Sequence, residues 1–295
     1  MLRCVFPVRR LIAGAIFAGA LGVFAPIPTQ AAEEELVLAF IPQENPEKLI
    51  GDIEVISAWL SERIGVPVKG FVTSDSAAAV EALRNDDADV SFMGALPYII
   101  ANNEIGAKVV LQELYRGSPV YTGRVFVRRD SGISKIEDLK DKTIAFADPL
   151  SESGYLYPLD IFVEAGFLER GDDPSVYFDK FYFAGGYQQA MQAMANGLVD
   201  AAAASQYAEL LLSPEQQTET IWIAESQPIP SHTVIVRKGI NADIEEKFVE
   251  AMLELNKPEN RSLLAHVYSP DGFIKADPSA YDDVKEIARA YGFVR

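Results

Sequence analysis

Residues 143–154 decide the fold, and they read Thr143-Ile-Ala-Phe-Ala-Asp-Pro-Leu-Ser-Glu-Ser-Gly154. The apolar residues 143–147 predict a buried strand, and the Asp-Pro-Leu-Ser segment that follows predicts a turn. The apolar stretch 155–165 then predicts a helix. The alternation continues with a strand, a helix and a strand at residues 177–183, 187–196 and 199–203. Such alternation is typical of an α/β domain with parallel strands.

An earlier part of the chain has the same plan. In residues 49–64, apolar side chains recur at steps of three and four, which is the pattern of an amphipathic helix. The other expected elements are strands at 36–41, 66–72 and 89–92, and helices at 77–84, 97–103, 242–255 and 282–291. The chain therefore contains two α/β units.

Two β-branched segments, 124–128 and 233–237, flank the later unit, and we interpret them as the two chain crossings between the units. The expected fold class is α/β with two lobes, in which two crossing strands form a hinge that allows closure around a ligand. Residues 32–126 plus 233–295 would form lobe 1, and residues 127–232 would form lobe 2.

Residues 1–31 have the pattern of a secretory signal peptide. Three arginines precede an apolar run at 11–24, and the small residue Ala31 stands at the expected cleavage site. The run is shorter than the roughly 20 residues that span a bilayer; a buried N-terminal helix is the alternative. The pattern predicts export to the periplasm.

The chain is acidic, with 43 Asp and Glu residues against 26 Lys and Arg residues and a formal net charge of −17. This acidity argues against nucleic acid and anionic membrane surfaces as partners. The single cysteine, Cys4, lies in the predicted signal peptide, so the exported chain is expected to have no disulfide and no thiolate metal site. With two histidines in the chain, no metal or cofactor is expected.

The sequence contains no recognisable enzymatic motif. It has no G-x-S-x-G, Walker-type or H-E-x-x-H pattern. Its histidines, His232 and His266, lack an evident catalytic partner. Asp148 and Glu152 form a carboxylate pair, which we interpret as a turn acid and an acid at a helix start. We therefore expect a binding protein and not an enzyme.

Five segments carry a family signature. They are Ile136-Glu-Asp-Leu-Lys-Asp-Lys-Thr-Ile-Ala-Phe-Ala-Asp-Pro149, Leu150-Ser-Glu-Ser-Gly154, Phe183-Ala-Gly-Gly-Tyr-Gln-Gln-Ala190, Ala195-Asn-Gly-Leu-Val-Asp-Ala201 and Asp89-Val-Ser-Phe-Met-Gly-Ala-Leu-Pro-Tyr98. Together they resemble the substrate-binding proteins of phosphate, phosphite and phosphonate ABC importers, which are periplasmic binding proteins of the type II fold. The resemblance implies a monomer that captures a small phosphorus oxyanion and delivers it to a membrane permease.

In that family, a Ser-Thr-Ser-Gly turn opens a helix of the second lobe and holds an oxyanion with hydroxyls and backbone N–H groups. Ser151, Ser153 and Gly154 match that turn, which by itself could be an ordinary helix N-cap. Glu152 replaces the threonine, and its carboxylate would repel an oxyanion unless it points away as a surface acid.

Other ligand-facing positions of the family also differ here. At the start of the next helix, Tyr187 and Gln188 stand where the family commonly has a histidine and an acid. After the following strand, Ser205 stands where the family has an acid, and Tyr207 follows it. In the first lobe, Ser76 and Met93 stand where the family has aromatic residues.

Three further candidates follow from position. Tyr98 follows a predicted strand end and faces either the cleft or the core. Tyr121, with Thr122, precedes one predicted crossing and is either a cleft residue or hinge packing. His232 precedes the other crossing and is either a ligand contact or a structural histidine. The residues Gln43, Glu44 and Asn45 follow the first strand, at the sheet end where α/β proteins bind ligands.

The sequence is compatible with two classes of ligand. Without acids at Gln188 and Ser205, the amine of an aminophosphonate has no partner, which favours phosphite, phosphate or an alkylphosphonate. If Glu152 faces the pocket, the ligand is a different small polar or amine-bearing molecule. A periplasmic sensor that presents its ligand to a receptor would use the same capture chemistry.

Overall fold

The structure is a computed structural model that describes residues 34–42 and 46–295. Contacts join Glu34–Arg295 into one unit. The predicted signal peptide and the candidates Gln43, Glu44 and Asn45 lie outside the described residues. In the part of the chain that is described, no helix is long and apolar enough to cross a bilayer.

The first main sheet has six strands. Their order is β13 (Gly272–Lys275), β4 (Lys108–Leu114), β12 (Thr233–Val236), β3 (Val90–Met93), β1 (Leu36–Phe40) and β2 (Val68–Val72). The strand β1 is parallel to β2 and β3, whereas β12 is antiparallel to β3 and β4. β3 is buried along its whole length, as a central strand covered on both faces requires.

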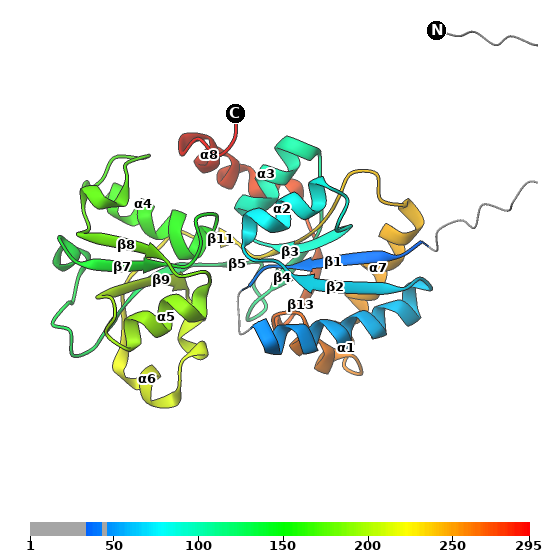
Figure 1. The fold of residues 1–295 in the computed structure, drawn as a ribbon, viewed down its shortest axis with the longest axis horizontal. Coiled ribbons are helices and arrows are strands. Elements are labelled where there is room, and N and C mark those ends of the chain that lie inside the picture. Colours follow the sequence, from blue (N-terminus) through cyan, green and yellow to red (C-terminus); the bar gives the residue numbers. More distant parts are fainter. Residues whose placement is uncertain (1–33, 43–45) are drawn as a thin grey trace, which may run out of the picture. The chain divides into compact units, whose positions relative to one another are not determined.

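Helices cover both faces of this sheet (Figure 1). They are α1 (Pro46–Ile64), α2 (Ser76–Arg84), α3 (Ala95–Ile105), α7 (Ala242–Glu254) and α8 (Asp282–Ala290). α1 packs against α7 on one side, and α2 and α8 pack against α3 on the other. The expected helix at 49–64 is therefore present, with its apolar residues Leu49, Ile53 and Ile56 in the core.

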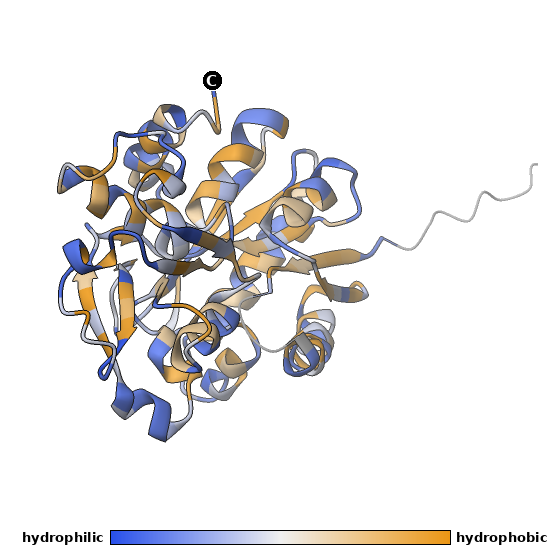
Figure 2. Cartoon of the chain, turned by 60° about the vertical axis from the view of Figure 1, so that its left-hand side comes forward, coloured by the Kyte–Doolittle hydropathy of each residue, from blue (hydrophilic) through white to orange (hydrophobic). Residues whose placement is uncertain are grey.

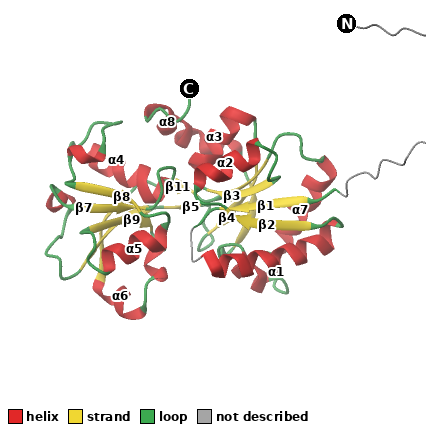
Figure 3. Cartoon of the chain, viewed as in Figure 1, coloured by secondary structure: helices red, strands yellow, loops and turns green. Residues whose placement is uncertain are grey.

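The second main sheet has five strands. Their order is β10 (Thr220–Glu225), β6 (Gly123–Arg128), β9 (Ala201–Ser205), β7 (Thr143–Phe146) and β8 (Lys180–Phe183). α4 (Tyr157–Glu164) covers one face, and α5 (Tyr187–Ala195) with α6 (Pro214–Glu219) lies on the other (Figure 3). Four alanines and a serine make up β9, and these small side chains let α5 pack closely on the sheet. Figure 2 shows apolar residues concentrated in the strands and polar residues on the outer helices.

The two crossings lie elsewhere than we expected from 124–128 and 233–237. The structure places Gly123–Arg128 inside the second sheet and Thr233–Val236 inside the first. The chain instead passes between the sheets at β5 (Val120–Tyr121) and β11 (Ile229–Pro230), which pair antiparallel with each other. The β-branched segments fill buried central positions, where such side chains pack best.

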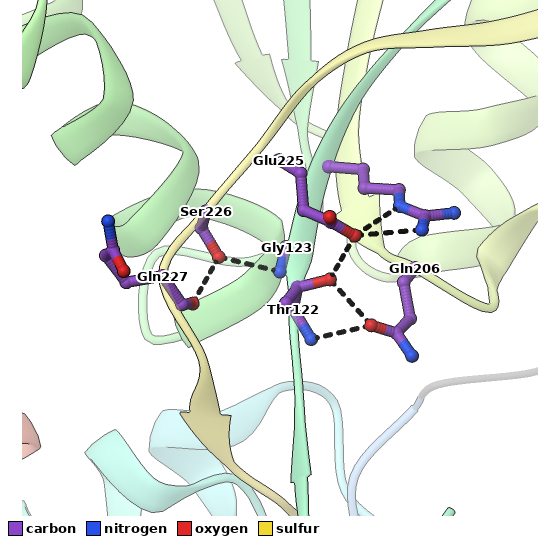
Figure 4. A network of polar contacts seen from close by, with 7 residues as sticks. Thr122, Gly123, Gln206, Glu225, Ser226 and Gln227 are labelled. Atoms are coloured by element: carbon purple, nitrogen blue, oxygen red, sulfur yellow. Dashed lines mark hydrogen bonds and ion pairs between the residues drawn. The ribbon is translucent and has the colours of Figure 1, made fainter. Parts of the chain in front are cut away.

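Polar contacts fix one end of the β5 crossing (Figure 4). The Thr122 N–H donates to Oε1 of Gln206 at 3.0 Å, and the Thr122 hydroxyl lies 2.6 Å from that oxygen and 2.8 Å from Oε1 of Glu225. Burial acts to raise the pKa of Glu225, but hydrogen bonds from Thr122 and Arg124 hold it below its usual value. Thr122 thus connects the β5 crossing to Gln206, which follows β9, and to Glu225, which ends β10.

Several other elements differ from the sequence-based expectations. The strands β4, β10 and β13 were not expected. The strand expected at 177–183 starts only at Lys180, because Pro174–Val176 forms a 3-10 turn. The helix expected at 155–165 is preceded by a π-helical turn at Glu152–Leu156. The remaining 3-10 turns are Ile136–Leu139, Ala208–Leu211, Arg261–His266 and Pro278–Tyr281.

Candidate functional site

A cavity of about 380 Å³, part of which is open to solvent, lies where the two sheets face each other. Four helices begin at its wall, because it is lined by Ser76 of α2, Gly94 before α3, Ser151 and Glu152 of the π-helical turn, and Gly186 and Tyr187 at the start of α5. The remaining lining residues are Ile41, Pro42, Pro97, Ala147, Asp148, Leu150, Gly185 and His232. Several of them directly follow β1, β7 and β8, so the cavity lies at the carboxyl ends of parallel strands, where α/β proteins bind ligands.

The electrostatics of this cavity come from backbone and acids. A helix N-terminus carries partial positive charge and unpaired N–H groups, so it favours an anion. The charged side chains that are described as lining the cavity are Asp148 and Glu152, and no lysine or arginine is among them. An anion bound here would therefore depend on backbone N–H groups and hydroxyls.

Glu152 faces the cavity. Its side chain is 1% exposed, and its carboxylate accepts the N–H of Leu96 in the first turn of α3. The carboxylate fills the place where a side chain of Gly94 would stand, with Oε1 2.8 Å from an ideal Cβ there. Burial raises the pKa of Glu152 to about 7. The alternative of an outward-pointing surface acid is thus wrong.

Asp148 makes a similar contact between the two sheets. Its carboxylate accepts the N–H of Ser76 at 3.3 Å, at the start of α2, and the N–H of Leu150 at 2.7 Å. Burial raises its pKa. Acids of the second sheet's turn thus occupy the N-termini of two helices, α2 and α3, that belong to the first sheet.

Ser151 and Ser153 of this turn make hydrogen bonds within the protein. Ser151 accepts the N–H of Gly154 at 3.0 Å, so it caps its own helical turn while also lining the cavity. Ser153 is fully buried, and its Oγ lies 2.8 Å from the hydroxyl of Tyr187. A Cβ at Gly154 would lie 2.5 Å from Cβ of Ala147, which explains the glycine. Ser153 does not line the cavity itself but contacts Tyr187, which does.

A second cavity of about 500 Å³ adjoins the first, and Tyr187 and His232 line both. Its walls are mainly aromatic: Tyr115, Tyr121, Tyr187, Ser205, Tyr207, Ala208, Leu211, His232 and Tyr268. The rings of Tyr187 and His232 are parallel with centroids 6.5 Å apart. Burial lowers the pKa of His232 to about 4, so the imidazole is neutral at physiological pH.

The two cavities gather most, but not all, of the candidates. Ser76, Ser151, Glu152, Tyr187 and His232 line the first, and Tyr121, Ser205 and Tyr207 line the second. Sequence reasoning missed Tyr115 and Tyr268. Tyr115 directly follows the unexpected strand β4, and Tyr268 lies in a loop after a 3-10 turn, so neither position carries a local signal.

Five candidates lie away from the cavity walls. Ser153 and Gly154 are buried within the π-helical turn, and Gln188 is half-buried on α5. Met93 is fully buried at the end of β3. The ring of Tyr98 packs edge-on against Tyr281 at 5.2 Å. Tyr98 and Met93 are core residues because α3 is enclosed between the sheet and α8.

Comparisons with known proteins agree with this architecture. Residues 38–281 match the model of a family described as "ABC transporter, phosphonate, periplasmic substrate-binding protein". The phosphate-import protein PhnD of Mycolicibacterium smegmatis is 32% identical over 174 residues, which are 57% of this chain and 54% of that protein. The chain thus matches about half the length of this relative. The phosphonates-binding periplasmic protein of Escherichia coli is 28% identical over 248 residues, covering 80% of this chain and 72% of that protein.

A solved structure shows the same fold. PhnD1 of Prochlorococcus marinus in complex with methylphosphonate superposes with a TM-score of 0.77 at 20% identity, covering 88% of this chain and 98% of that chain. The expected two-lobe periplasmic binding fold is confirmed, and so is the family resemblance. The chain belongs to the family of periplasmic substrate-binding proteins of phosphonate ABC transporters.

Proposed function

We propose that the protein captures a small phosphorus oxyanion between its two lobes and delivers it to the permease of an ABC importer. The observation that carries this proposal is the start of α5, which lines the cavity beside the turn of Ser151 and, among the described residues, has no side chain hydrogen-bonded to its first N–H groups. Unpaired N–H groups at helix starts are donors suited to phosphoryl oxygens. The names of the mycobacterial and Escherichia coli relatives point to phosphate and phosphonates, which are ligands of this class.

The second cavity bears on which oxyanion is bound. Phosphite or phosphate would occupy the first cavity and leave the second empty. A phosphonate also carries an organic group. The aromatic walls of Tyr115, Tyr121 and Tyr207 adjoin the first cavity through Tyr187 and would surround such a group. We therefore favour a phosphonate with a small organic substituent.

An amine-bearing ligand is the second candidate. The acids Asp148 and Glu152 line the first cavity together with the ring of Tyr187. Carboxylates next to aromatic rings favour a cationic group. This candidate predicts binding of amines that lack any phosphorus group.

The wider proposal includes export, lobes and partners. Residues 1–31 act as the signal peptide, and two lobes, built on the six-stranded and the five-stranded sheet, close about the paired crossings β5 and β11. The exported protein works as a monomer, leaves its ligand chemically unchanged, and needs no cofactor. Presentation of the ligand to a sensor instead of a permease would use the same closed state.

A thermal-shift screen of the purified protein tests the ligand class. The panel holds phosphate, phosphite, methylphosphonate, 2-aminoethylphosphonate, sulfate and simple amines. A ligand at 100 times its dissociation constant adds about 2.7 kcal/mol of stability, which is a visible shift in Tm. We expect a shift with a phosphorus oxyanion. A shift with amines alone would refute the proposal in favour of the second candidate.

A double-mutant cycle tests how Ser153 contributes. Ser153→Ala and Tyr187→Phe each remove one end of the 2.8 Å hydrogen bond between the two hydroxyls. Each is expected to weaken oxyanion binding by about 0.5–1.5 kcal/mol, because the Tyr187 hydroxyl loses its fixed direction or is absent. In titration calorimetry the double variant should lose no more than the larger single loss. Additive losses would mean that both hydroxyls bind the ligand separately.

A further inference from the structure

Glu152 places a carboxylate inside the proposed anion site. It is 1% exposed, it lines the cavity, and it accepts the N–H of Leu96 at the start of α3. Gly94 leaves the space that this carboxylate fills. Because a carboxylate only accepts hydrogen bonds when ionised, it offers nothing to an oxyanion that carries no hydrogen.

The described surroundings supply no cation to offset this charge. The groups whose charge acts on Glu152, or on which its charge acts, are the acid Asp148 and the phenols of Tyr121, Tyr157, Tyr187 and Tyr281. His232, which lines the same cavity, is neutral above about pH 4 because burial lowers its pKa. Two negative charges a few ångströms apart in a buried site do not stay ionised together.

We propose that the site takes up its oxyanion together with one proton, which lies between a Glu152 carboxylate oxygen and an oxygen of the ligand. The proton comes from the ligand when it arrives in its acid form, or from solvent when it arrives fully ionised. No covalent bond other than O–H changes. The inference rests on the proposed function, since it concerns the same ligand and the same cavity.

The titration of Glu152 sets the pH range of the effect. Burial raises its pKa to about 7, so the carboxyl is largely protonated below pH 7 and ionised above. Above both this pKa and the second ionisation of the ligand, every bound ligand must draw its proton from solvent. Affinity should then fall about tenfold for each pH unit, because the free site and the free ligand lack a proton that the complex holds.

Titration calorimetry with methylphosphonate between pH 8 and 9.5 measures this directly. At each pH, two buffers of different ionisation enthalpy give the number of protons taken up. The variant Glu152→Gln keeps the size of the side chain and can donate a hydrogen bond without titrating. The matched control is Glu113→Gln, because burial raises the pKa of Glu113 to about 8 while its side chain does not line the first cavity.

We expect wild type and Glu113→Gln to take up about one proton and to lose affinity about tenfold per pH unit. Glu152→Gln should take up none and keep a constant affinity. Binding by wild type without proton uptake would overturn the inference and leave the proposed function standing. Loss of the uptake in Glu113→Gln, and not in Glu152→Gln, would also overturn it. If methylphosphonate and phosphate bind neither wild type nor Glu152→Gln from pH 5 to 9.5, the proposed function itself fails.

Discussion

Replacing Gly186 with alanine is expected to weaken oxyanion binding roughly 10- to 100-fold. Gly186 precedes α5 and lines the first cavity. A Cβ at this position would lie 2.6 Å from the carbonyl oxygen of Pro42, which follows β1 in the other sheet. The backbone of Gly186 is extended, with φ of 161°, so alanine is strained by its contacts alone. A Cβ would also lie 2.6 Å from Oε1 of Gln189, but that atom ends a flexible side chain, whereas the carbonyl of Pro42 is backbone. The variant should resist the close approach of the two lobes.

Titration calorimetry with methylphosphonate measures the loss in Gly186→Ala. The core of each lobe is untouched, so the unfolding free energy of the ligand-free variant should stay within about 0.5 kcal/mol of wild type. Gly51→Ala is the control, because nothing lies within 4 Å of a Cβ there. Equal affinities of Gly186→Ala and wild type would show that Gly186 and Pro42 do not approach in the bound state.

The variant Gly123→Ala should lose about 1–3 kcal/mol of stability. Gly123 begins β6, and a Cβ there would lie 2.7 Å from the carbonyl oxygen and 3.0 Å from Cα of Ser153. These are backbone atoms that cannot move aside as a flexible side chain would. Urea unfolding should show a lower midpoint with an unchanged slope.

Comparing the stability change in Gly123→Ala with that in Gly51→Ala separates the effect of packing from that of helix propensity. Gly51→Ala lies in α1 with open space around the new methyl group, and it should raise stability by about 0.5–1 kcal/mol. A Gly123→Ala midpoint equal to or above that of wild type would mean that the π-helical turn carrying Ser153 is not packed against β6.

The βα units could be predicted from the sequence, and the crossings could not. The helix α1 and the strands β1 and β7 carry strong periodic or apolar patterns, and each lies where these patterns predicted it. The crossings β5 and β11 have two residues each, which is too short for any pattern. The sequence pattern therefore points to β6 and β12 in place of the crossings, because buried strands and crossing strands are both β-branched.

The candidate site, like the fold, could be predicted only where the local sequence carries a signal. Ser151 and Tyr187 could be found because they begin helices directly after strands. The direction of Glu152 could not be found, since an acid at a helix start has the same local sequence whether it faces solvent or a cavity. Its partner Leu96 is 56 residues away, and only the folded chain brings the two together.

A crystal structure of the protein grown with arsenate tests the central claim most directly. Arsenate is a phosphate analogue, and the anomalous scattering of arsenic locates it without ambiguity. We predict one arsenic atom in the 380 Å³ cavity, with its oxygens about 3 Å from N–H groups at the start of α5 or in the turn that holds Ser151. Arsenic found only beside lysine or arginine side chains on the surface, with this cavity empty, would contradict the account.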